Sequence, residues 1–367
     1  MTILTLALSL GCPPSPTPDS SLEADTDADT DADTDTDTDA DTDSDTDTDP
    51  QGQTTAYLTT SDFSVGALAV VNLEDGTFDE PTDIAADASV HVEDGHVYVI
   101  GRLGFDYVRR YLPGSWDAPV SEFSVGTNPN DLEICDSKTF VSHYGETWIG
   151  IYDDDGTLTG TVDLSTYGDS DTIGPEASNL AEVAGTLYVV LQRLNRDGGW
   201  VTEGSKVVEI DCASESITGD WDVGGNAQLW QAPTGELYVT HEAWDTTPAG
   251  LSKLDPGGDG FTTVVEFTDG NPVGIAVSQD GTTGLMNITN SSYQYGVQCV
   301  DLGDGSTTEA EWLDYGYMVG IGGNDRDEAF MGGHYGAANG VVVYDIASCA
   351  QTSVIGTTLP GTSVVFD

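Results

Sequence analysis

The chain has 367 residues, in which 9 Lys and Arg stand against 64 Asp and Glu, giving a formal net charge of −55. Such a surface repels DNA and RNA, because nucleic-acid binding depends on Lys and Arg that neutralise phosphates. Nucleic acid is therefore excluded as a partner. The 44 glycines, together with regularly spaced β-forming residues, predict many short strands joined by tight turns.

Residues 1–12, MTILTLALSLGC, form a short apolar run that ends at Gly11-Cys12. This run resembles the end of a bacterial lipoprotein signal peptide, in which cleavage precedes a cysteine that is then acylated. The resemblance implies lipidation of Cys12, and Pro13 after the cysteine implies delivery to the outer membrane. The alternative is a truncated ordinary signal peptide, since no Lys or Arg precedes the run. Twelve residues are too few to span a bilayer, so a lipid anchor is the only membrane contact expected.

Residues 13–52 are predicted to be a disordered acidic stalk. Every second residue from Asp25 to Asp49 is Asp, alternating with Thr, Ala or Ser, so no large apolar side chain compensates for the entropy lost on ordering. Asp-x-Asp spacing also occurs in calcium loops, but those loops need a turn glycine and a terminal Glu. Weak, non-specific divalent-cation binding is all that the stalk predicts, and no cofactor or specific metal site is expected.

The remaining residues, 53–367, repeat at 41 to 50 residues, a period typical of propeller blades and solenoids. One extended segment recurs at 55–60, 96–101, 138–144, 186–192, 236–242, 284–290 and 328–335. A second follows it at 69–76, 107–114, 148–156, 206–214, 250–257, 296–305 and 341–348. A third extended stretch precedes most copies of the first. The pattern predicts seven blades of about four strands each.

The first copy lacks its own preceding strand, and Thr362–Phe366 at the other end of the chain supplies a matching one. A ring closed by this strand removes the open sheet edges, whereas a solenoid would need polar capping repeats. The predicted fold is therefore an all-β, seven-bladed β-propeller, closed by pairing of its C-terminal strand with its N-terminal blade.

The segments 270–286 (GNPVGIAVSQDGTTGLM) and 127–141 (TNPNDLEICDSKTFV) carry a further resemblance. With the aligned Asp153, Asp211, Asp255, Asp301 and Asp345, they resemble the repeats of YVTN-type, YncE-like bacterial propellers. The resemblance implies the fold and leaves the activity open, because related propellers include binding proteins, lactonase-like hydrolases and quinone-dependent dehydrogenases.

The loops between second and third strands are predicted to share one face and to carry any ligand. Three of the five His and three of the six Arg of this acidic chain fall in them. The candidate binding residues are His143, Tyr144, Arg193, Arg196, Trp200, His241, Glu242, Trp244, Tyr293, His334 and Tyr335. The alternative is that these side chains are merely exposed or cap their neighbours. His241 and Glu242 resemble the pair used by streptogramin-lyase-type propellers, although neighbouring strand residues point to opposite faces.

Four cysteines besides Cys12 are an even number in an exported domain, which favours disulfides. The expected bonds are Cys135–Cys212 and Cys299–Cys349, out of three possible pairings. The sequence thus predicts a periplasmic or surface lipoprotein, monomeric, whose propeller binds an unknown protein or small molecule. The rival hypothesis is a lactonase- or lyase-type enzyme that uses the same face.

Overall fold

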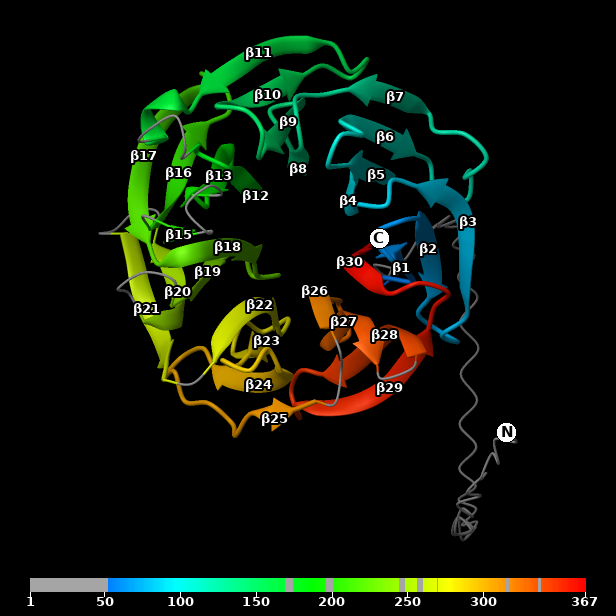
Figure 1. The fold of residues 1–367 in the computed structure, drawn as a ribbon, viewed down its shortest axis with the longest axis vertical. Coiled ribbons are helices and arrows are strands. Elements are labelled where there is room, and N and C mark those ends of the chain that lie inside the picture. Colours follow the sequence, from blue (N-terminus) through cyan, green and yellow to red (C-terminus); the bar gives the residue numbers. More distant parts are fainter. Residues whose placement is uncertain are drawn as a thin grey trace, which may run out of the picture. The chain divides into compact units, whose positions relative to one another are not determined.

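The computed structural model describes residues 52–168, 174–195, 201–202, 204–243, 248–255, 260–268, 270–313, 317–335 and 338–367, without the side chains of 201, 317–319, 334, 335 and 338. The predictions for the signal peptide, Cys12 and the acidic stalk lie outside these residues. The repeats fold into seven antiparallel sheets of four strands, arranged as blades around a central axis (Figure 1). The predicted seven-bladed propeller is confirmed.

Each blade contributes one strand to each of four concentric positions, and the blades are numbered from the N-terminus. The innermost strands, from blade 1 to blade 7, are β30 (Gly361–Phe366), β4 (Ala88–Glu93), β8 (Pro129–Cys135), β12 (Ala177–Val183), β18 (Gly225–Gln231), β22 (Asn271–Val277) and β26 (Tyr317–Gly323). The second strands are β1 (Thr55–Ser61), β5 (His96–Gly101), β9 (Lys138–His143), β13 (Thr186–Leu191), β19 (Leu237–Glu242), β23 (Thr283–Thr289) and β27 (Glu328–Tyr335).

The third strands are β2 (Gly66–Asn72), β6 (Tyr107–Tyr111), β10 (Trp148–Tyr152), β16 (Ser205–Asp211), β20 (Ala249–Asp255), β24 (Tyr295–Asp301) and β28 (Ala338–Asp345). The outermost strands are β3 (Phe78–Ile84), β7 (Ser121–Ser124), β11 (Leu158–Asp163), β17 (Ser216–Val223), β21 (Gly260–Phe267), β25 (Glu311–Trp312) and β29 (Ala350–Gly356). A two-stranded ribbon, β14 (Leu194–Asn195) and β15 (Val201–Thr202), and a 3-10 turn, η1 (Ser165–Tyr167), complete the described elements.

The ring closes through its last strand, as the sequence predicted. Strand β30 pairs antiparallel with β1, so that Ala56 lies opposite Phe366 and Leu58 opposite Val364. Beyond the strand, the Asp367 carboxylate accepts the backbone N–H groups of Thr54 and Thr55 at 2.9 and 3.0 Å. Blade 1 is thus built from both ends of the propeller, and β30 gives it the innermost strand that the other blades also have.

The core is divided among the seven interfaces between neighbouring blades. One cluster of buried apolar side chains fills each interface, for example Val90, Val97 and Leu68 between blades 1 and 2. Because each blade is covered by a neighbour on both faces, the middle strands are apolar on both sides. In β5, five consecutive residues after His96 are buried. Alternate side chains of a middle strand therefore pack against the blade on one side or the other. Whether a side chain is exposed depends on how far its strand lies from the central axis.

The turns between third and fourth strands are held by the repeated aspartates. Asp153 accepts the backbone N–H of Thr157, and Asp345 accepts that of Ser348. The hydrogen bonds from Ser348 hold the pKa of Asp345 below its usual value. These aligned aspartates form turns, which explains why an Asp recurs at this position in five of the seven blades.

Both predicted disulfides are present. Cys135–Cys212 joins the end of innermost strand β8 in blade 3 to the turn after β16 in blade 4. Cys299–Cys349 joins β24 in blade 6 to the turn after β28 in blade 7. Each bond therefore covalently links two neighbouring blades.

Candidate functional site: the central channel

The first predicted loop histidine, His143, is fully buried in blade 3. Its Nε2 accepts the Gly126 backbone N–H at 3.1 Å, so Nδ1 carries the proton and donates to the Trp148 carbonyl at 3.4 Å. Burial lowers its pKa to about 4, although the Trp148 hydrogen bond and the charge of Glu146 oppose this shift. Both ring nitrogens serve the backbone, so His143 is a structural residue and not the ligand-facing residue predicted.

His241 and Glu242 have different neighbours among the described residues. The His241 ring is 6% exposed and packs against two glycines. A Cβ added to Gly224 would lie 2.3 Å from its Nδ1, and one added to Gly250 would lie 3.0 Å from its Nε2. Glu242 instead accepts the Asn226 side-chain amide at 2.6 Å. The two side chains therefore contact different neighbours, and the acid–base pair that the lyase resemblance implies stays a prediction.

The other described loop candidates have three different environments: one holds a loop by hydrogen bonds, one is exposed on the surface and one lines the channel. Arg193 donates to the carbonyls of Tyr167 and Gly204 at 2.9 and 3.1 Å, which ties the loop to its neighbours. Tyr293 is 85% exposed at the tip of the β23–β24 turn. Tyr144 donates its hydroxyl to Gln192 and lines the central cavity. Arg196, Trp200 and Trp244 lie outside the described residues, as do the side chains of His334 and Tyr335, so their predicted roles stay predictions.

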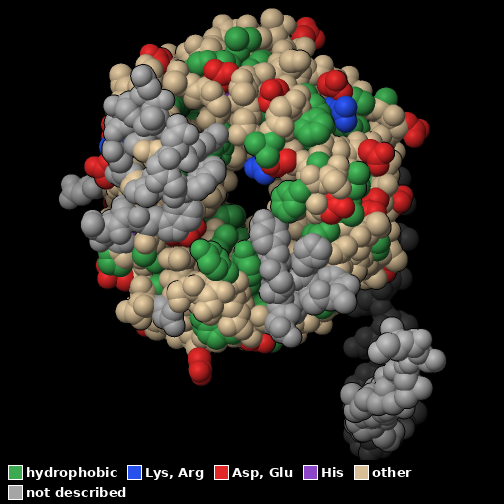
Figure 2. All heavy atoms as spheres, viewed as in Figure 1, with side chains coloured by type: hydrophobic (Ala, Val, Ile, Leu, Met, Phe, Trp, Pro, Cys, Tyr) green, Lys and Arg blue, Asp and Glu red, His purple; other side chains and the backbone are tan. Residues whose placement is uncertain are grey.

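A cavity of about 500 Å³ occupies the centre of the ring. It is lined by residues of all seven innermost strands, and the space-filling view shows an opening there (Figure 2). Its polar wall residues concentrate on blades 2 to 4: Ser89, His91, Arg102, Asn130, Asp131, Glu133, Tyr144 and Asn179. The opposite wall is mainly apolar and includes Trp230, Val273 and Ile321. The cavity thus offers one polar side and one apolar side to a small molecule.

Two charged residues of the polar wall, Arg102 and Asp131, are held by neighbouring groups. Arg102 pairs with the Asp87 carboxylate, its Nε lying 2.7 Å from Oδ1. Asp131 accepts the backbone N–H of Leu180 on the next blade at 2.9 Å. Burial raises the pKa of Asp131, while the charge of His91 and the Leu180 hydrogen bond oppose the shift. Arg102 is thus held by a neighbouring carboxylate, and Asp131 by the backbone of the next blade.

His91, Glu93 and Glu133 form a cluster lower in the same wall. Their ligating atoms all lie within 4.8 Å of one another, and His91 Nε2 is 3.5 Å from Glu93 Oε2. Burial alone lowers the pKa of His91, but the Glu93 carboxylate and the charges of Glu133 and Asp131 raise it to about 8. Burial raises the pKa of Glu133 to about 8 as well, although the charge of His91 pulls it down.

The sequence analysis missed this cluster because it searched the loops and left the innermost strands to the core. A signal was present: HVE at 91–93 and DLE at 131–133 place titratable residues two apart, a pair that the innermost strands of the other five blades lack. Two such charges on one strand share a face. In a strand next to the axis, that face borders the channel.

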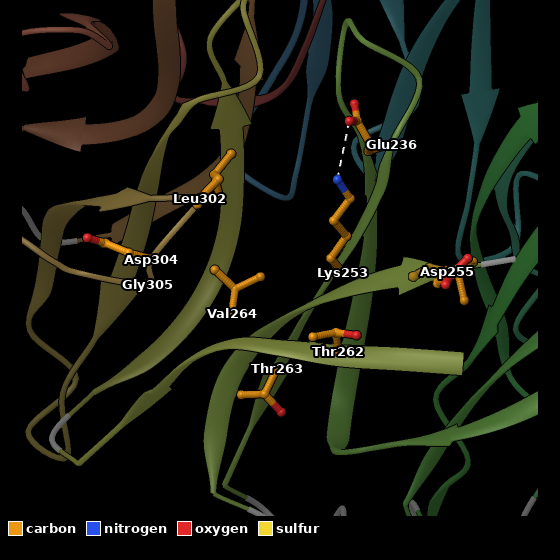
Figure 3. Close-up of a pocket in the computed structure, with 11 residues that line it drawn as sticks. Glu236, Lys253, Asp255, Thr262, Thr263, Val264, Leu302, Asp304 and Gly305 are labelled. Atoms are coloured by element: carbon orange, nitrogen blue, oxygen red, sulfur yellow. Dashed lines mark hydrogen bonds and ion pairs between the residues drawn. The ribbon is translucent and has the colours of Figure 1, made fainter. Parts of the chain in front are cut away.

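A second cavity, of about 550 Å³, lies at the outer edge between blades 5 and 6. Figure 3 shows Lys253 and Glu236 pointing toward one another, and their 3.2 Å ion pair neutralises both charges. The rest of the wall is formed by Thr262, Thr263, Val264 and the turn at Leu302–Gly305. With its charged pair satisfied internally, this groove offers less recognition chemistry than the channel.

No helix among the described residues is long and apolar enough to cross a membrane. No protein-family model matches the sequence, and no curated protein matches it either.

Solved structures of several bacterial propellers share the fold. A 6-phosphogluconolactonase-type protein of Bacteroides fragilis aligns with a TM-score of 0.63 at 13% identity, covering 87% of this chain and 99% of that one. Its counterpart from Bacteroides uniformis gives 0.62 at 11%, covering 86% and 100%. The periplasmic gluconolactonase of Pseudomonas aeruginosa gives 0.60 at 12%, covering 85% and 98%. At these identities the comparison shows a shared seven-bladed propeller fold, and the YncE-like resemblance stays a prediction.

Proposed function

We propose that the protein is an exported lipoprotein whose propeller binds a small ligand in its central channel. The observation that carries this proposal is the two-sided cavity of about 500 Å³, with fixed polar groups on one wall and Trp230 on the other. Concave sites that combine an apolar surface with a few convergent polar groups are typical of small-molecule binding. The described histidines of the loop face, in contrast, are buried in the blades.

The charge of the channel defines the class of ligand. Asp131, Glu133 and Glu93 lie in or beside its polar wall, whereas Arg102 is already neutralised by Asp87. An anionic ligand such as a sugar phosphate would meet carboxylates without a free basic partner in the described wall. A neutral polyhydroxylated molecule or a cation suits the wall, because carboxylates and amides accept and donate hydrogen bonds to hydroxyl groups.

A matched pair of tyrosines tests this proposal. Tyr144 lines the channel and Tyr293 stands exposed on a loop of the same face, so both can be truncated with little effect on the blade cores. Sugars, sugar lactones and small amines would be screened against the full-length protein by thermal shift and calorimetry. We expect Tyr144→Ala to weaken the binding of a hit at least tenfold and Tyr293→Ala to leave it unchanged. Loss of affinity in Tyr293→Ala alone would place the ligand on the loops and reject the channel.

Export is supported by the two inter-blade disulfides, since such bonds persist in oxidising compartments outside the cytosol. The Gly11-Cys12 boundary supports a lipid anchor. Membrane fractionation of cells that express the full chain tests this part: Cys12→Ala should move the protein into the soluble fraction, and the wild type should carry acyl chains by mass spectrometry. A variant that stays in the membrane fraction, with no lipid on the wild type, would contradict the anchor.

A lactone hydrolase is the second candidate. The propellers that share the fold include proteins named gluconolactonases, and His91 lies beside two carboxylates in the channel wall. Lactone hydrolysis needs a group that activates water and one that protonates the leaving alkoxide, and a clustered His and Glu supply such groups. Acid release from unphosphorylated sugar lactones, followed in a pH-stat, separates the two candidates: turnover that His91→Gln abolishes favours the enzyme, and binding without turnover favours the binding protein.

A further inference from the structure

The cluster of His91, Glu93 and Glu133 brings together two neighbouring blades at the channel. His91 and Glu93 are two residues apart on innermost strand β4, so they share one side of that strand. Glu133 comes from β8, the innermost strand of the next blade. Nearby, the Ser89 hydroxyl donates to the Asn130 carbonyl at 2.9 Å, which fixes the two strands against one another. The three side chains therefore meet at a junction that the fold itself holds.

The Nε2 atom of His91 is buried, forms a long ion pair with Glu93 and has no hydrogen-bond partner at ordinary distance. Buried polar atoms nearly always have a partner, and an exception in a native fold asks for an explanation such as an ion. The nearest oxygen of Glu93 lies 3.5 Å away, beyond ordinary hydrogen-bond distance. A metal ion between the imidazole and the carboxylates would satisfy this nitrogen, because a neutral imidazole binds metals through its lone pair.

The charges around the cluster also favour a cation. Two carboxylates lie within 4.8 Å of the same imidazole, and Asp131 is on the same strand as Glu133. Apart from His91 itself, the only basic side chain in the described wall of the cavity is Arg102, which is engaged by Asp87. Several carboxylates beside one low-dielectric wall repel each other, and a bound divalent ion relieves that repulsion.

The ligand set indicates which metal would bind. One imidazole nitrogen with two carboxylate oxygens is a mixed N/O set, which suits Zn²⁺ and its transition-metal neighbours better than Ca²⁺ or Mg²⁺, which prefer all-oxygen sites. Zn–N and Zn–O bonds of about 2.0–2.2 Å place tetrahedral ligand atoms about 3.3 Å apart. The ligand atoms, now within 4.8 Å of one another, would approach to that spacing when the ion binds. We propose that His91, Glu93 and Glu133 form a transition-metal site of the Zn²⁺ class in the wall of the central channel.

Three protein ligands leave a fourth position of a tetrahedral ion open, as in catalytic zinc sites. His91 and Glu133 both line the cavity, so the open position faces the space in which the proposed ligand would bind. A water or a ligand hydroxyl can occupy it. The site goes beyond the proposed function, since metal binding requires no organic ligand in the channel and is measurable without one.

The test uses the full-length, disulfide-bonded protein, with millimolar Ca²⁺ present to occupy the weak cation sites of the Asp-rich stalk. Zn²⁺ is titrated by competition with a chromophoric chelator, and Co²⁺ is used as a spectroscopic probe of the ligand field. We expect one tight equivalent per chain, weakened about 100-fold or more in His91→Gln and in Glu133→Gln. His96→Gln is the matched control, because His96 follows the same β4–β5 turn, binds the Asp94 carbonyl and lies outside the cluster.

Wild-type protein that binds no tight equivalent overturns the site, as does equal affinity in His91→Gln and the wild type. If either cluster variant fails to fold, anomalous diffraction at the zinc edge from wild-type crystals soaked in Zn²⁺ decides the matter. An ion between His91, Glu93 and Glu133 supports the proposal, and an ion elsewhere or none rejects it. Tight metal binding without any organic ligand would support this site and count against the proposed function. An organic ligand bound in the channel without tight metal binding would support the proposed function and reject the metal site.

Discussion

Two histidines in neighbouring blades show opposite uses of the same side chain. His143, at the end of β9 in blade 3, has both ring nitrogens bound to backbone groups, and burial lowers its pKa to about 4. His91, in β4 of blade 2, stands among carboxylates that raise its pKa to about 8 against the effect of burial. Both lie in interfaces between blades. They differ in the groups around their ring nitrogens: His143 contacts main-chain groups, whereas His91 contacts acidic side chains.

The comparison teaches where to look for function in a ring of similar blades. A buried polar group that the backbone satisfies stabilises the fold, whereas one that meets only other titratable side chains is a candidate for ligand or metal chemistry. Position in a loop of the conventional ligand face did not separate these cases. Position on an innermost strand did, since those strands supply most of the channel wall.

The largest effect is expected from opening the ring that encloses both histidines. Deleting residues 361–367 removes β30, its ladder with β1 and the buried Val364, and it takes away one wall of the channel. We expect loss of more than about 5 kcal/mol, enough to abolish cooperative unfolding of a protein of ordinary stability. Deleting Asp367 alone is the control, which removes only exposed hydrogen bonds. Equal melting temperatures for both deletions, by circular dichroism, would contradict closure as the source of stability.

The direct test of the comparison is truncation of each histidine. His143→Ala removes a fully buried ring and leaves the Gly126 N–H without its acceptor, so we expect a loss of about 3 kcal/mol in the free energy of unfolding. His91→Ala removes a part-exposed ring that belongs to none of the buried apolar clusters and whose Nε2 makes only a long ion pair with Glu93, so about 1 kcal/mol or less is expected without added metal. Urea denaturation measures both. The contrast fails if His91→Ala proves as destabilising as His143→Ala.

A smaller, pH-dependent effect sharpens the view of His143 as a neutral structural residue. Its folded-state pKa of about 4 lies below the unfolded value near 6.5, so on acidification the unfolded chain takes up a proton first. Stability is therefore complete above about pH 6.5 and falls as the pH drops toward 4, by at most about 3 kcal/mol. Urea midpoints at several pH values should show a slope shallower by up to one proton in His143→Gln. Identical slopes would show that His143 is charged in the folded state.

Much of the fold followed from the sequence because its determinants are local and repeated. Apolar strands of similar spacing, glycines at matching turns and an aligned Asp in five repeats predicted the blades, and the unmatched strand at 362–366 predicted closure. The disulfide pairs followed from the same alignment, since a blade register places Cys135 beside Cys212 and Cys299 beside Cys349.

The sequence by itself determined the number of blades, the order of their strands, the closure and the acidic character of the chain. Only the tertiary structure decided which polar residues meet. In a propeller both faces of every blade are covered by neighbouring blades. The alternation of side chains along a strand therefore shows which neighbour a residue faces, but it does not distinguish a core position from the channel wall. That choice depends on distance from the axis, which is why His143 turned out to be a core residue while His91 and Glu133, 42 positions apart, came together.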